Sequence, residues 1–126
     1  MLKHYHWLVL GPLAALTACS GTGDALRKAE SYHALGHEPG WLLTIDNARL
    51  RFVTSSPMTN IETLRPIPQI SPLGRRYSTD RLTLDIATQP CHDVRSGIAF
   101  SDTVVVTAGT YSYRGCGGDR VPLLNR

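Results

Sequence analysis

The chain has 126 residues, and its 13 lysines and arginines against 10 aspartates and glutamates give a formal charge of +3. The basic residues are scattered among acidic ones and form no stripe interleaved with aromatic residues, so nucleic-acid binding is not expected. The length suits one small domain, and no segment after the first 18 residues is apolar for long enough to cross a bilayer.

Residues 1–18 have the three parts of a secretory signal. Lys3 supplies positive charge, residues 7–18 form an apolar run, and small residues precede Cys19. Twelve residues span roughly 18 Å as a helix against about 30 Å of hydrocarbon, which is too short for a permanent membrane helix. The residues at 16–19, Leu-Thr-Ala-Cys, are typical of a bacterial lipoprotein processing site and predict cleavage before Cys19 and lipidation of that cysteine. A cleaved signal beside a coincidental cysteine is the alternative.

Lipidation of Cys19 would place the rest of the chain in the bacterial cell envelope. Ser20 after the cysteine, in place of an aspartate, resembles the usual signal for transfer to the outer membrane, with the domain facing the periplasm. Residues 19–31 begin with glycine, serine and threonine and show no clean apolar stripe, so we expect a lipidated flexible tether. Some ten residues of tether would hold the domain, residues 32–126, about 15 to 20 Å from the lipid.

Short segments predict strands in the first half of the domain. Residues 32–36, which open with the aromatic Tyr32, come first, and Pro39 then excludes a helix interior in the turn that follows. Residues 42–46 and 50–54 form a hairpin around a turn at Asp46-Asn47. Trp41, leading a strand that continues with Leu43 and Ile45 in alternation, is expected in the core, with a ligand platform at a barrel mouth as the alternative.

Four prolines between residues 55 and 73 break any long element, although residues 58–64 could form a brief strand. Strands are then predicted at 75–78 and 81–88, the second with its leucines inward, followed by a loop at 90–97. The three consecutive valines from Val104 predict a buried strand within 98–107, paired across a turn at Ala108-Gly109 with 110–116.

This spacing of strands, with almost no helical pattern, predicts an all-β fold. We expect a small antiparallel, lipocalin-like barrel of about seven or eight short strands with one disulfide, because closure protects the edges of a hydrophobic sheet better than a sandwich does.

With Cys19 assigned to lipid, Cys91 and Cys116 are the remaining cysteines. An oxidising compartment favours joining them, and the bond would stabilise the domain by roughly 3 to 4 kcal/mol in the chain-entropy model. Two buried free thiols are the alternative.

No group of residues predicts a metal site, a cofactor or catalysis. His33, His37 and Glu38 could hold zinc only on a helix, which Gly36 and Pro39 oppose, whereas a strand separates the two histidines by some 13 Å. Residues 91–93, Cys-His-Asp, are adjacent rather than converging, and a disulfide would consume the nucleophile. We therefore expect a protein that is not an enzyme.

Two clusters, residues 34–41 (Ala-Leu-Gly-His-Glu-Pro-Gly-Trp) and the pair Pro90-Cys91 with residues 113–117 (Tyr-Arg-Gly-Cys-Gly), resemble the motifs of a family of bacterial envelope lipoproteins of unknown activity. The resemblance implies a small β-barrel of the kind found in META-domain heat-shock lipoproteins and in membrane-bound inhibitors of c-type lysozyme, with the two late cysteines joined. His37, Gly40 and residues 91–97 depart from the family pattern.

The same clusters supply a candidate binding surface, which consists of Glu38, Trp41, Tyr113 and Arg114. The resulting hypothesis is a monomeric, lipid-anchored, non-enzymatic envelope protein that binds a partner protein or a small ligand. The alternative is an inhibitor of c-type lysozyme, although a slightly basic chain gains no electrostatic steering toward a basic enzyme.

Overall fold

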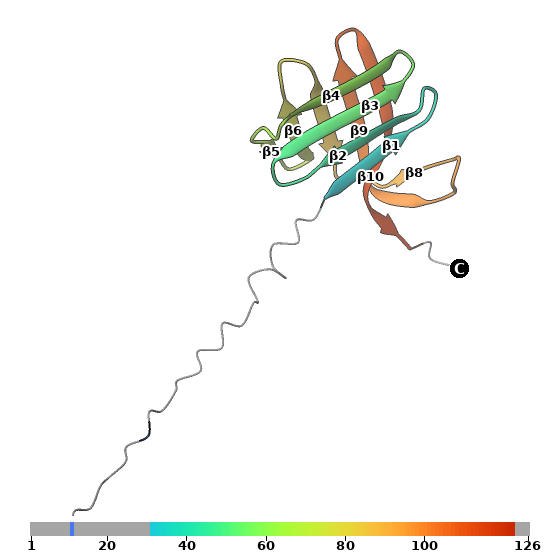
Figure 1. Cartoon of the computed structure of the whole chain (residues 1–126). Helices are drawn as coiled ribbons and strands as arrows, with labels where there is room; N and C mark the ends of the chain where they lie inside the picture. Colours follow the sequence, from blue (N-terminus) through green and yellow to red (C-terminus); the bar gives the residue numbers. More distant parts are fainter. Residues whose placement is uncertain (1–10, 12–30, 123–126) are drawn as a thin grey trace, which may run out of the picture.

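The computed structural model describes Gly11 and residues 31–122, so the signal segment apart from Gly11, Cys19 and all of the tether except Ser31 lie outside the described residues. Figure 1 shows strands that curl around a common core. The ten strands are β1 (Tyr32–Gly36), β2 (Trp41–Ile45), β3 (Arg49–Ser55), β4 (Met58–Leu64), β5 (Gln69–Ser71), β6 (Gly74–Ser78), β7 (Thr83–Ala87), β8 (Cys91–His92), β9 (Ala99–Ala108) and β10 (Tyr111–Val121).

The strands form one antiparallel sheet in the order β4-β3-β2-β1-β10-β9-β7-β6-β5, with the short β8 paired to β9. The sheet curls into a half-barrel, which confirms the all-β, barrel-like antiparallel prediction and its one disulfide. It has ten strands, more than the seven or eight expected. The order ends at β4 and at β5, a strand of three residues between Pro68 and Pro72. Because proline has no N–H to donate, these prolines limit the length of β5, the edge strand that would have to pair with β4 to close the barrel.

Alternating side chains of the strands fill the inside of the curl. The largest fully buried ones include Leu43, Leu50, Phe52, Leu84 and Val104. In β9 the pattern of the valines is strict, since Val104 and Val106 are completely buried and Val105 is not. The interior is therefore a packed hydrophobic core, and burial of its apolar surface is the main source of stability.

The sequence predicted the bounds of β1 and β4 correctly and those of the other long strands to within two residues, except that β10 continues to Val121 and does not end at residue 116. The leucines of the predicted strand at 81–88 do point inward, as Leu82, Leu84 and Ile86 are all buried. The two shortest strands, β5 and β8, were missed. In the part of the chain that the structure describes, no helix is long and apolar enough to span a membrane.

Candidate functional site

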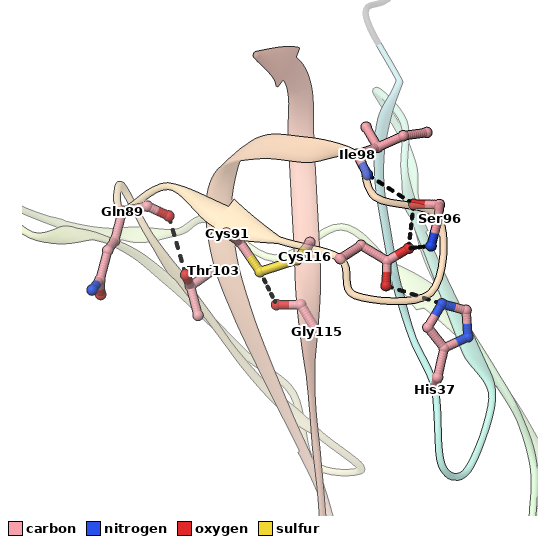
Figure 2. Close-up of a disulfide and its surroundings, with 9 residues drawn as sticks. His37, Gln89, Cys91, Ser96, Ile98, Thr103, Gly115 and Cys116 are labelled. Atoms are coloured by element: carbon pink, nitrogen blue, oxygen red, sulfur yellow. Dashed lines mark hydrogen bonds and ion pairs between the residues drawn. A yellow bond between two sulfur atoms is a disulfide. The ribbon is translucent and has the colours of Figure 1, made fainter. Parts of the chain in front are cut away.

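Cys91 of β8 and Cys116 of β10 form a disulfide, with their Cα atoms 5.4 Å apart (Figure 2). The prediction of this pair is confirmed, and the alternative of two free thiols is wrong. The bond ties the loop that follows β7 to the centre of β10, close to the point where β1 pairs with β10. Cys91 has no thiol to act as a nucleophile, and its neighbour His92 is exposed.

Asp93 organises the loop beyond the disulfide and joins it to the β1–β2 turn. Its side chain is only 8% exposed, and its Oδ1 lies 3.1 Å from Nε2 of His37. Its Oδ2 accepts hydrogen bonds from the hydroxyl and the backbone N–H of Ser96. The Ser96 hydroxyl, together with that N–H and His37, holds the pKa of Asp93 below its usual value. Asp93 is therefore a structural carboxylate that fixes two segments far apart in sequence.

Trp41 lies on the inner face of β2, against two glycines of neighbouring strands. A Cβ on Gly36 would stand 2.1 Å from Nε1 of the indole, and a Cβ on Gly115 would stand 2.7 Å from its Cζ2. The indole also packs on Phe52, whose ring lies 5.2 Å from that of Tyr113. Trp41 and Tyr113 are thus core residues, 3% and 4% exposed.

The four residues predicted as a binding surface do not share one surface. Trp41 and Tyr113 point inward, whereas Glu38 and Arg114 are exposed. Glu38 stands in the β1–β2 turn with a φ of 63°. Arg114 lines a hollow of about 540 Å³ beside the disulfide, together with His37 and Asp93. Sequence alternation places Trp41 in the core, but it does not show that Tyr113 faces the same way as Phe52.

Four apolar side chains lie together on the outer face of the sheet, next to the β1–β2 turn. Leu35, Leu42 and Val53 are successive partners in the register of β1, β2 and β3. Leu42 is 62% exposed, and Met58 at the start of β4 is 89% exposed. All four line a hollow of about 600 Å³. We call these four residues the apolar row.

The next outward row along β1, β2 and β3 is polar, so the apolar row ends there on these three strands. It contains His33, Thr44 and Arg51, again as successive partners. Sequence analysis missed the apolar row because only the register brings its members together. The signal that could have found it is the apolar Leu42 at an outward position of an otherwise alternating strand.

The two histidines considered for zinc have different surroundings. His33 is an outward residue of β1, and His37 turns to Asp93. Among residues 31–122 no three histidine, cysteine, aspartate or glutamate side chains come together as metal ligands.

Comparison with known proteins adds no relative. No family model, curated protein or solved structure matches the chain.

Proposed function

We propose that the chain is a lipid-anchored protein of the bacterial cell envelope, held in the outer membrane through Cys19 and facing the periplasm, and that it binds a partner protein through the apolar row. The residues Leu-Thr-Ala-Cys at 16–19 support the anchor. The Cys91–Cys116 disulfide supports an oxidising compartment outside the cytoplasm.

The observation that carries the proposal is the contrast between the inside and the outside of the sheet. Inside, side chains such as Leu43, Phe52 and Val104 are at most 1% exposed, so packed side chains fill the middle of the half-barrel. Outside, Leu42 and Met58 present apolar surface to solvent. An exposed apolar patch rimmed by polar residues is typical of a protein interaction site.

The place of the apolar row favours a protein over a lipid surface as its occupant. The chain enters the domain at Tyr32, and the row adjoins the turn at the opposite end of β1, roughly 13 Å away at 3.3 Å per residue. Figure 1 shows this turn at one end of β1 and the start of β1 at the other. A tether attached at Tyr32 leaves that end free to meet a protein in the periplasm. The row itself carries no charge, so the matching surface of the partner should be apolar.

Site-specific photocrosslinking in intact cells tests this surface. A photoreactive residue at position 42 should give a discrete cross-linked product, because Leu42 lies at the centre of the row. Position 44, the next outward residue of β2, is the matched control and should give none. The product at position 42 should disappear when Val53→Asp places a charge in the row. Identical products from both positions, or a product unaffected by Val53→Asp, would contradict the proposal.

Inhibition of c-type lysozyme is tested by a direct assay. The apolar row offers no carboxylate to a basic enzyme, and this makes it a poor match for lysozyme. Inhibition at micromolar concentration that is lost in Leu42→Asp would make lysozyme the partner. Activity that stays unchanged at that concentration would remove lysozyme from consideration.

A further inference from the structure

Another hollow lies at the other end of the half-barrel, where the chain enters at Tyr32. It has a volume of about 670 Å³, and Ile45 and Tyr77 are among its lining residues. Its charged residues come from β6, β9, β10 and the β4–β5 connection: Arg65, Arg75, Asp102 and Asp119. We call this hollow the entry cleft. The apolar row shares no residue with it.

Asp102 and Tyr32 form a partly buried polar pair in the entry cleft. The Tyr32 hydroxyl donates a hydrogen bond of 2.9 Å to Oδ2 of Asp102, a residue that is only 8% exposed. Burial, and then the bond to Asp102, raise the pKa of Tyr32, so the phenol keeps its proton and stays a donor. Among residues 31–122 no hydrogen bond reaches the other carboxylate oxygen, Oδ1. That oxygen can therefore accept a bond from a ligand.

Two arginines of the entry cleft lie over aromatic rings. The guanidinium carbon of Arg75 is 4.8 Å from the centre of the Tyr32 ring, and that of Arg65 is 5.9 Å from the centre of the Tyr77 ring. Neither arginine makes an ion pair with any carboxylate in the part of the chain that is described. Arg65 donates one hydrogen bond of 3.4 Å from Nη1 to the backbone carbonyl of Asp46. The other N–H groups of Arg65 and those of Arg75 stay available to an oxyanion, whose geometry a guanidinium matches.

The backbone of β10 makes room for this arrangement. The register between β9 and β10 shifts between Gly117 and Arg120, which marks a bulge. A Cβ on Gly117 would stand 2.5 Å from the Tyr32 hydroxyl, and one on Gly118, at a φ of 83°, would stand 2.7 Å from Oδ2 of Asp102. Bulges of this kind occur preferentially next to binding and active sites, where they redirect the strand.

We propose that the entry cleft binds a small zwitterion that carries a primary ammonium beside an oxyanion. The cleft holds two guanidinium groups and two carboxylates, so a simple anion or a simple cation would meet like charges. A zwitterion satisfies both sets: its oxyanion accepts hydrogen bonds from Arg75 and Arg65, and its ammonium donates to Oδ1 of Asp102. The phosphoethanolamine group has this chemistry, either as a free molecule or as the headgroup of a phospholipid.

Isothermal titration of the full lipidated chain in detergent tests the ligand class. Phosphoethanolamine should bind, whereas inorganic phosphate and ethanolamine, each with half of the groups, should bind at least tenfold more weakly. Phosphocholine should also bind more weakly, because its methylated ammonium has no N–H for Asp102. Equal affinity for phosphate and phosphoethanolamine, or no binding of phosphoethanolamine at millimolar concentration, would overturn the proposal.

Variants assign the two ends of the ligand. Arg75→Gln should weaken phosphoethanolamine and phosphate alike by about tenfold, and Asp102→Asn should weaken phosphoethanolamine alone. Arg81→Gln removes an exposed arginine outside the cleft and should change neither affinity. If Asp102→Asn fails to fold, Tyr32→Phe, which keeps the ring under Arg75, tests the same end of the cleft. Unchanged binding in both Arg75→Gln and the folded Asp102-side variant would refute the site.

Reconstituting the lipidated chain in vesicles distinguishes a free zwitterion from a phospholipid headgroup as the ligand. In phosphatidylcholine vesicles, free phosphoethanolamine should bind as it does in detergent. Adding phosphatidylethanolamine to the vesicles weakens that apparent affinity if the cleft takes the lipid headgroup, and leaves it unchanged if the cleft takes a free zwitterion. Either result is compatible with the shared chemistry and decides its origin.

Discussion

The imidazole Nε2 of His37 lies 3.1 Å from Oδ1 of Asp93 and joins the turn between β1 and β2 to the loop between β8 and β9. More than fifty residues of chain separate the two. The disulfide fixes one side of that loop, and Asp93 fixes the other through His37 and Ser96. The shape of the surface beside the apolar row therefore depends on one carboxylate.

Because the pKa of Asp93 is lowered in the folded protein, the free energy of unfolding should fall in acid. Its folded pKa lies below the ordinary value of 3.8, so the stabilising contribution is present above that value and is lost as the pH falls through the folded pKa. The urea midpoint should therefore drop as the pH falls below 3.8. Asp93→Asn should flatten this dependence. The backbone N–H groups of Ala48 and Arg49 lower the pKa of Asp46 as well. Asp46→Asn is therefore the comparison: it should remove the contribution of Asp46 to the pH dependence and leave that of Asp93.

Gly36→Ala should destabilise the domain by more than about 2 kcal/mol, because the new Cβ would overlap the Trp41 indole and the Arg114 carbonyl oxygen. Chemical denaturation measures the loss, and the emission of Trp41 should shift as its ring is displaced. Gly40→Ala is the matched control in the same turn region. Its Cβ would stand 3.8 Å from the Ser55 hydroxyl, so its stability should change little. Equal effects of the two substitutions would show that the Trp41 contact is not the cause.

Local patterns in the sequence were enough to predict most strands. Alternation gave β3 and the inward face of β7, because side chains of successive strand residues point to opposite faces. The three residues of β5 and the two of β8 carry too few side chains to show a period. The open edges are also invisible in a local pattern, since they depend on which strands pair across the whole chain.

Both candidate sites escaped prediction for the same reason. Leu35, Leu42 and Val53 become neighbours only through the register of three strands. Tyr32 and Asp102 are 70 residues apart, and the glycines that admit their contact belong to the bulge in β10. The cysteines were different, because two residues and one known compartment chemistry leave a single pairing. The number of cysteines limits their pairing, whereas the residues of a surface are brought together only by the register of the strands.

Replacing both Cys91 and Cys116 by alanine should lower the free energy of unfolding by about 3 to 4 kcal/mol in the chain-entropy model. The bond spans a sequence separation of 25, and its removal frees the loop of Asp93 as well as the centre of β10. Denaturant titration of the oxidised protein and of the double variant measures the difference. A difference below about 1 kcal/mol would mean that the hydrogen bonds of the loop hold it without the bond.

Cys19→Ala should leave an unprocessed and unlipidated chain, because the proposed anchor requires the cysteine sulfur and cleavage in front of it. Metabolic labelling with palmitate should mark the unaltered chain and not the variant, and the variant should keep residues 1–18 in its mass. Cys91→Ala is the matched control, since it removes a different cysteine and should leave labelling intact. If the label persists in Cys19→Ala, the lipid is attached elsewhere and the membrane anchor has to be assigned to another residue.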